Sequence, residues 1–128
     1  MPAKTRILAV DDDAAICDLF EKGLPPLGFD VTCAASGKQA RSLLEKESFD
    51  LILMDIMMPD IDGITLTREI CSNPKTAKIP ILVVSGLSDA GTLEDALLYG
   101  AVDYIVKPID FALLKSKIDR ILALQEKR

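Results

Sequence analysis

Several side chains that bind cations or phosphoryl groups stand where short apolar segments of the sequence end. They are Asp11 and Asp12, Asp55, Ser85, and Lys107. Carboxylates held a few ångströms apart repel each other by roughly 4 kcal/mol per pair at an effective dielectric near 20. A cluster of such acids therefore takes up protons or binds a cation. Oxygen ligands without histidine or thiolate favour Mg²⁺, or Mn²⁺, over Zn²⁺.

The lysine and the hydroxyl extend this chemistry from a cation to a phosphoryl group. Lys107 offers a positive charge, and Ser85 a hydroxyl, to phosphoryl oxygens. In such surroundings the carboxylate of Asp55 can act as a nucleophile and form an aspartyl phosphate. Taken singly, each residue has an ordinary explanation; Asp13, for example, fits the cap at the start of a helix. Their recurrence at the ends of separate segments favours a functional acid pocket.

Five segments rich in β-branched and other apolar residues predict the strands that carry these side chains. They run over residues 6–10, 29–35, 51–55, 81–85 and 103–107, with helix-length segments between them. The strands are nearly continuous apolar runs, which is typical of a parallel sheet covered by helices on both faces. The repeated strand–helix–strand order predicts a doubly wound α/β fold, with one domain over residues 1–128.

The carboxyl ends of parallel strands meet at one edge of a sheet, and ligands of such folds bind there. The segment 29–35 ends in Ala34 and Ala35, which offer no reactive group. If this strand lies at the side of the sheet, the ends of the other four fall together. We therefore expect the acids, Ser85 and Lys107 to share one crevice.

The spacing of apolar residues predicts five helices between and after the strands. We expect Leu19 in the first helix and Leu97 in the fourth to face the sheet, as part of the inward stripes. Ser36 and Gln39 fit a capping box at the start of the second helix. Asp62 is the expected start of the third.

Charge and composition weigh against several classes of function. A formal net charge of −5 argues against direct binding of nucleic acid. The apolar runs are far shorter than a membrane span, and the N-terminus lacks the pattern of a secretory signal. Cys17, Cys33 and Cys71 have no CxxC spacing and the chain has no histidine, so we expect no zinc site. Cysteines of this kind suit a reducing compartment, and we expect the cytoplasm.

Four ordered motifs resemble a known family. "ILAVDDD", "FDLILMDIMMPDIDG", "IPILVVSG" and "GAVDYIVKPID" together resemble the receiver domain of two-component response regulators, and are similar to the chemotaxis response regulator. The resemblance spans the whole chain. It implies a flavodoxin-like sheet of five parallel strands in the order 2-1-3-4-5 with five helices. It also implies a phosphoprotein that acts as a switch in a phosphorelay.

By this resemblance, the residues of the acid pocket acquire individual roles. Asp55 would be the phospho-acceptor and one of the ligands of Mg²⁺. Asp12 would bind the metal directly, and Asp11 would act through a metal-bound water. The backbone carbonyl of Met57 would complete the protein ligands. Lys107 would pair with Asp55 and then with the phosphoryl group.

The resemblance also implies residues that transmit or support the switch. Ser85 would move to bind a phosphoryl oxygen, and Tyr104 would rotate as it does so. Pro108 would follow a cis peptide bond, and Gly63 would be the turn glycine after the acceptor loop. The pair Pro25-Pro26 stops the first helix early and departs from the family pattern, which leaves the local geometry there open.

Two apolar residues bear on the lifetime of the phosphoryl group. Met57 lies two residues after Asp55, and Leu87 lies two residues after Ser85. In the family, polar side chains at such positions often orient the attacking water. We therefore expect a long-lived phosphoryl group.

Two other classes of function compete with the switch. A phosphatase of the haloacid dehalogenase type also uses an aspartyl nucleophile, but needs a second Asp as general acid where this chain has Met57. A nucleotide- or flavin-binding module is disfavoured because the chain has neither GxGxxG nor a P-loop; "SGKQ" at Ser36 indicates a helix start. The complete set of acids, hydroxyl and lysine also argues against a receiver-like domain that has lost phosphate binding.

We therefore expect a signalling domain and not an enzyme that turns over a substrate. The resemblance implies that a histidine kinase or a histidine phosphotransfer protein donates the phosphoryl group. The fourth helix, fifth strand and fifth helix would then act on a downstream protein or a fused effector. We expect no direct contact with nucleic acid or membrane, and a monomer or a phosphorylation-dependent dimer.

Overall fold

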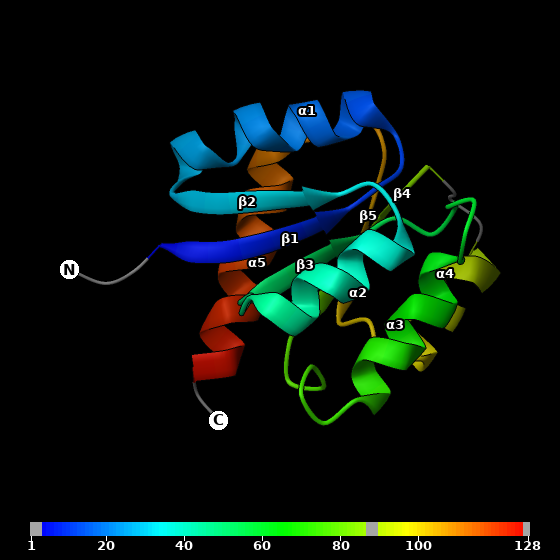
Figure 1. Cartoon of the computed structure of the whole chain (residues 1–128). Helices are drawn as coiled ribbons and strands as arrows, with labels where there is room; N and C mark the ends of the chain where they lie inside the picture. The colour runs from blue at the N-terminus through cyan, green and yellow to red at the C-terminus, as the bar shows by residue number, and fades with distance from the viewer. Residues whose placement is uncertain (1–3, 87–89, 127–128) are drawn as a thin grey trace.

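The computed structural model describes residues 4–86 and 90–126, which form one parallel sheet with helices on both faces (Figure 1). The strands are β1 (Thr5–Val10), β2 (Phe29–Ala34), β3 (Leu51–Met54), β4 (Ile81–Ser85) and β5 (Asp103–Val106). Their order in the sheet is β2-β1-β3-β4-β5. The predicted doubly wound, flavodoxin-like order is confirmed, and each strand lies within a residue of its predicted bounds.

The helices are divided between the two faces of the sheet. They are α1 (Ala14–Gly23), α2 (Gly37–Lys46), α3 (Gly63–Ser72), α4 (Ala90–Leu98) and α5 (Phe111–Glu126). Buried side chains of α1 and α5 pack on one face, and those of α2, α3 and α4 on the other (Figure 1). None of these helices is both long and apolar enough to cross a membrane.

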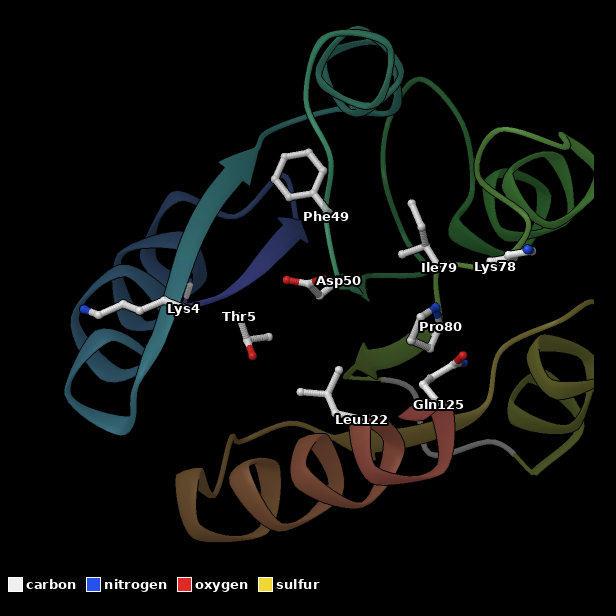
Figure 2. A pocket seen from close by; sticks show the side chains of 9 residues that line it. All are labelled: Lys4, Thr5, Phe49, Asp50, Lys78, Ile79, Pro80, Leu122 and Gln125. Carbon is white, nitrogen blue, oxygen red and sulfur yellow. The ribbon is translucent and has the colours of Figure 1, made fainter. Parts of the chain in front are cut away.

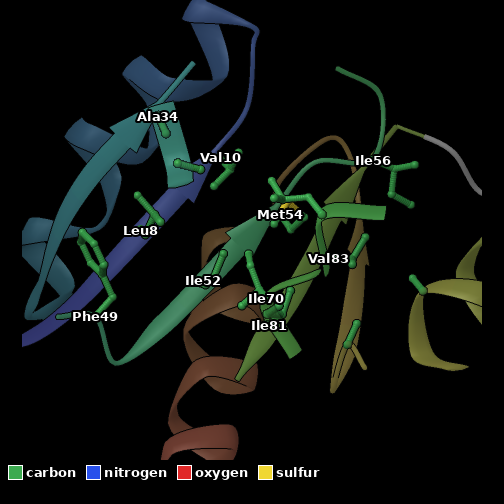
Figure 3. Close-up of a cluster of buried hydrophobic side chains, with 14 residues drawn as sticks. Leu8, Val10, Ala34, Phe49, Ile52, Met54, Ile56, Ile70, Ile81 and Val83 are labelled. Atoms are coloured by element: carbon green, nitrogen blue, oxygen red, sulfur yellow. The ribbon is translucent and has the colours of Figure 1, made fainter. Parts of the chain in front are cut away.

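The core consists of two clusters, one on each side of the sheet. Successive residues of a strand point to opposite faces, so Leu8 and Val10 join the cluster under α2, α3 and α4, whereas Ile7 and Ala9 join that under α1 and α5. Figure 3 shows the first of these clusters. All four residues of β3 are buried, which explains why the strand before Asp55 is a continuous apolar run.

Two of the residues expected to face the sheet are largely outside the core. Leu19 is 46% exposed and Leu97 is 39% exposed, so this part of the prediction is wrong. Each is adjacent in sequence to a fully or almost fully buried residue, Phe20 and Ala96 respectively. One residue corresponds to a turn of about 100° around a helix, and this places both leucines at the rim of the buried stripe.

The starts of the helices follow the predicted capping residues, with one difference. Asp62 accepts a hydrogen bond from Thr65 N at 2.8 Å and caps α3. Ser36 Oγ accepts one from Gln39 N at 3.1 Å and caps α2. Gln39 Oε1, however, accepts from Ala35 N at 2.6 Å and not from the capping residue itself, so the box is displaced by one residue.

The Pro25-Pro26 pair ends α1 without disturbing the core. Residues Pro25–Leu27 form one 3-10 turn, and Gly28 follows with φ of 99°. This left-handed conformation is one that glycine adopts at little cost. The turn leads directly into β2, so the departure from the family pattern is a local one.

Candidate functional site

An acidic pocket of about 520 Å³ lies beyond the carboxyl ends of β1, β3, β4 and β5. Its lining residues are Asp11, Asp12, Asp13, Asp55, Met57, Ser85, Gly86 and Lys107. The edge position of β2 brings the other strand ends together, as expected from its unreactive end. The acids, the hydroxyl and the lysine predicted to meet therefore do so.

The backbone continuing from β1 holds Asp11 at the base of this pocket. Asp11 N donates to Ala34 O at 3.0 Å, which extends the pairing with β2 by one residue. Its Oδ1 accepts from Asp13 N at 2.9 Å, and only 1% of Asp11 is exposed. Asp13 in turn caps α1 by accepting from Ala15 N, as predicted. Asp12, between them, is exposed at the mouth of the pocket.

Asp55 is held by the strand that precedes it and by the turn that follows. Asp55 N donates to Val10 O at 2.9 Å, and Gly63 N donates to Ile56 O at 2.6 Å. A Cβ on Gly63 would lie 2.0 Å from Asp55 O, so only glycine lets the start of α3 approach so closely. Asp55 is 6% exposed.

Lys107 is the cation that the site itself supplies. Its Nζ lies 2.8 Å from Asp11 Oδ2 and 3.5 Å from Asp55 Oδ1. The lysine thus lies closer to Asp11 than to Asp55, whereas the resemblance implies Asp55 as its partner. Its backbone N donates to Ser85 O at 2.8 Å, and the Lys107–Pro108 peptide bond is cis.

Burial and crowding perturb the ionisation of these groups. Burial, followed by repulsion from Asp11, raises the pKa of Asp55 from 3.8 to about 6, although Lys107 opposes the shift. Burial alone would lower the pKa of Lys107. Hydrogen bonds and charges from Asp11 and Asp55 outweigh burial and raise that pKa, so the lysine stays charged.

The acids are arranged to share a cation. Asp11, Asp12 and Asp55 each offer one carboxylate oxygen, and these oxygens lie within 4.8 Å of one another. A set of hard oxygen donors, two of them on buried residues, fits Mg²⁺ better than a metal that prefers nitrogen or sulfur. A cation would also offset the repulsion from Asp11, which after burial is the next cause of the raised pKa of Asp55.

The predicted switch residues are near each other but not both in the pocket. Ser85 ends β4 at 1% exposure and lines the pocket. Tyr104 lies on β5 opposite Val83 and packs partly buried against the core, with Lys117 Nζ 5.8 Å from its ring centre. Leu87 lies outside the described residues.

The structure adds one residue that the sequence did not reveal. Asp60, in the loop after Asp55, accepts hydrogen bonds from Gly37 N at 3.2 Å and Lys38 N at 3.0 Å. These partners lie 22 and 23 residues away at the start of α2. No short-range pattern signals a contact across that separation.

A second hollow of similar volume lies at the opposite end of the sheet (Figure 2). Its lining residues are Lys4, Thr5, Phe49, Asp50, Lys78, Ile79, Pro80, Leu122 and Gln125. Asp50 is its one acid, and that carboxylate already accepts from Arg6 N at 2.8 Å. The convergent acids, hydroxyl and lysine are at the other end, so the chemistry is assigned there.

A doubly wound sheet of order 2-1-3-4-5, with acids and a lysine at the ends of its strands, defines a flavodoxin-like domain with an acid pocket whose oxygens are arranged to share a cation. The comparisons with known proteins identify the family. The sequence model of the response regulator receiver domain matches residues 7–119, and the chain belongs to this family.

Relatives and solved structures agree with this assignment. The transcriptional regulatory protein ZraR of Escherichia coli K12 is 39% identical over 118 residues, which are 91% of this chain and 26% of that protein. The probable transcriptional regulator ycf27 of Porphyridium aerugineum is 36% identical over 97% of this chain and 50% of its own length. The chain therefore spans between a quarter and a half of these curated relatives.

Among solved structures, a CheY-like receiver domain protein from Methanospirillum hungatei JF-1 superimposes with a TM-score of 0.90 at 34% identity, covering 98% of both chains. The receiver domain of sensor histidine kinase PA1611 from Pseudomonas aeruginosa PAO1 gives 0.86 at 34% identity, with 94% and 99% covered. The chain is thus a receiver domain of the two-component type, and a phosphorylation switch follows from that family. Receiver domains bind Mg²⁺ at an acidic site, and the cluster of Asp11, Asp12 and Asp55 is present here.

Proposed function

We propose that Asp55 accepts a phosphoryl group from a phosphohistidine of a histidine kinase or histidine phosphotransfer protein. The bond between an Asp55 carboxylate oxygen and phosphorus forms as the bond from phosphorus to the histidine nitrogen breaks, and the nitrogen keeps the electron pair. The observation that carries the proposal is the position of Asp55: buried at a strand end, beside two acids and 3.5 Å from the Lys107 ammonium.

The neighbouring residues have complementary roles in this proposal. Asp12, Asp55 and the Met57 carbonyl would hold Mg²⁺ directly, and Asp11 would hold it through water. Bound Mg²⁺ would offset the negative charge of the acids and of the incoming phosphoryl oxygens. Support comes from the donor set and from the PA1611 receiver domain, which is described with a magnesium ion coordinated in its active site cleft. Lys107 and Ser85 would contact the remaining phosphoryl oxygens.

The site is tested by labelling the protein with a small phosphodonor in Mg²⁺ buffer. Intact-mass spectrometry should show one added phosphate on the wild-type chain and none on Asp55→Ala. Asp13→Asn is the matched control, because it removes a charge from the same pocket but keeps an oxygen for the cap of α1. Equal labelling of the wild type and Asp55→Ala would refute Asp55 as the acceptor.

We infer that the chain does not turn over an external substrate. An aspartyl phosphatase of the haloacid dehalogenase type would place a general acid where Met57 lies, at the pocket mouth with 64% of its surface exposed. A thioether cannot donate or accept the required proton. The expected result with phosphate monoesters is no release of phosphate above the rate of the Asp55→Ala variant.

The output surface we propose consists of α4, β5 and α5. Tyr104 is half-buried on β5, one strand away from the pocket residue Ser85, and Lys117 of α5 lies over its ring. Leu98 of α4 and Val102, which precedes β5, are also exposed, at 76% and 47%. Phosphorylation would shift the population of this surface between two states that a partner or attached output domain distinguishes. The relatives with longer chains are transcriptional regulators, so we propose control of an effector, through a monomer or a phosphorylation-dependent dimer.

A further inference from the structure

The acceptor loop, residues 56–62 between β3 and α3, carries a proposed metal ligand on its backbone. Residues 56–62 connect Asp55 to the start of α3, and Met57 is exposed at the mouth of the acid pocket. The two ends of the loop are fixed by Asp55 N on Val10 O and by Gly63 N on Ile56 O. A carbonyl in such a loop binds a cation well only if the middle of the loop is also held, because outer contacts orient metal ligands.

Asp60 ties the middle of this loop to α2. Its Oδ1 accepts from Gly37 N at 3.2 Å, and its Oδ2 accepts from Lys38 N at 3.0 Å. These amides belong to the first turn of α2, where backbone N–H groups lack partners within the helix and favour a negative charge. The same hydrogen bonds, that from Lys38 first, lower the pKa of Asp60, so the carboxylate is ionised at neutral pH.

The close contact between the acceptor loop and α2 also depends on a glycine. A Cβ on Gly37 would lie 2.2 Å from Ile61 Cγ2, so a side chain there would displace the loop. Ile61 instead packs against the core cluster beneath α2 and α3. Asp60 and Ile61 therefore bind α2 together, one through charge and hydrogen bonds and the other through packing.

Ser36 already caps this helix from within its own segment. Its Oγ accepts from Gln39 N, a different amide from those that Asp60 binds. The contact of Asp60 is thus a second cap, supplied by the acceptor loop. Because Ser36 already caps α2, the second cap has less effect on the helix. Its main effect is to fix the position of the loop that carries Asp60.

We propose that Asp60 is a positioning residue for the metal site: by binding the start of α2, it holds the acceptor loop so that the Met57 carbonyl faces the cation. This inference rests on the proposed Mg²⁺ site of Asp11, Asp12, Asp55 and Met57. Asp60 itself does not touch the metal or the phosphoryl group.

The test is a titration of the whole chain with Mg²⁺ alone, followed by calorimetry or by NMR of the backbone amides. Asp60→Ala should weaken Mg²⁺ binding by about tenfold, the low end of the effect of outer contacts on metal affinity. Ser36→Ala is the matched control, since it removes a cap from the same helix but leaves the loop contact intact. It should bind Mg²⁺ as tightly as the wild type, because the contact that orients the proposed metal ligand is unchanged.

Asp60→Asn separates position from charge. It keeps one side-chain oxygen, which can accept from one of the two α2 amides, and it loses the negative charge. Asp60→Asn should therefore recover part of the affinity that Asp60→Ala loses. The proposal is overturned if Asp60→Ala binds as tightly as the wild type, if Ser36→Ala weakens binding equally, or if Asp60→Asn is as weak as Asp60→Ala. Asp12→Ala distinguishes the proposed site from this inference: if it binds Mg²⁺ as the wild type does, the site itself is wrong.

Discussion

At the scale of single residues, the site keeps a carboxylate in surroundings that disfavour its charge. Asp55 is almost fully buried and close to two other acids, and its pKa is raised to about 6. The Lys107 ammonium, which among the described residues is the one paired with Asp55, is shared with Asp11, which lies closer. Groups whose pKa is strongly perturbed are typical of functional sites, where stability is given up for reactivity.

This perturbation predicts that Asp55→Asn stabilises the metal-free protein. The folded-state pKa of about 6 exceeds the ordinary 3.8, so the folded chain binds the proton more tightly and the free energy of unfolding falls as the pH rises from 4 to 6. Above that window, ionised Asp55 destabilises the fold by about 3 kcal/mol at most.

Urea unfolding in chelator should therefore show a gain for Asp55→Asn of about 1–3 kcal/mol at pH 8 that shrinks toward pH 4. A gain that is the same at both pH values would contradict the role of ionisation.

Met57 leads to a second prediction at this scale. Its exposed thioether at the pocket mouth offers no group that can orient an attacking water. Met57→Asn should shorten the lifetime of phosphorylated Asp55 by about tenfold, because a positioned polar group helps deliver the water. The loss of phosphate is followed by mass spectrometry after the phosphodonor is removed. Leu98→Asn, a change of similar type at an exposed position of α4, should leave the lifetime unaltered.

At the scale of elements, the site depends on close approach of a loop and a helix. Gly63 is the first residue of α3 and lies directly against the carbonyl of Asp55. Any residue with a Cβ would clash with that carbonyl oxygen. The helix caps act at the same scale: Asp13 begins α1 beside the pocket, and Asp62 begins α3. The acceptor loop thus leads from β3 into a helix whose start is fixed by the last side chain of the loop, Asp62.

Gly63→Ala should destabilise the fold and impair the site together. Its Cβ would meet Asp55 O at 2.0 Å and Ile56 Cα at 2.8 Å, both of them backbone atoms that cannot rotate away. We expect a loss of about 2 kcal/mol or more in the free energy of unfolding, together with slower labelling of Asp55. Gly86→Ala serves as the stability control, because a Cβ there meets no atom of the described residues within 4 Å, apart from its neighbours in the chain. Similar destabilisation of both variants would argue against the close approach as the cause.

At the scale of the whole molecule, the sheet places three carboxylates at one end, and the Lys107 ammonium offsets only part of their negative charge. The three acids of the cluster come from the ends of β1 and β3, and Lys107 reaches them from the end of β5. A cation that binds this cluster in the folded state but not in the unfolded chain stabilises the whole domain.

Mg²⁺ should therefore raise the free energy of unfolding by about 2.7 kcal/mol at roughly 100 times its dissociation constant. The gain should fall as the pH drops below about 6, where Asp55 takes up a proton and the cluster loses charge. Thermal melts with and without Mg²⁺ at pH 8 and pH 5 measure both effects. Asp12→Ala should lose the stabilisation; if it keeps the wild-type gain, the cation binds elsewhere.

Much of the fold and most of the site could be predicted from the sequence because they depend on local patterns. Apolar runs and helical spacing predicted each strand within a residue and the start of α3 at Asp62. Acids, hydroxyl and lysine at strand ends predicted the pocket, since parallel strands bring their carboxyl ends to one edge. The family resemblance assigned the roles within it.

Other features were decided only when distant segments met in the tertiary structure. Three such features depend on packing between elements far apart in sequence. They are the closer pairing of Lys107 with Asp11, the position of two leucines at the rim of their buried helix stripes, and the amide partners of Asp60. A sequence pattern records the period of one element and the residue at its end. The distances across a pocket arise from how several elements pack at once, and no single segment contains them.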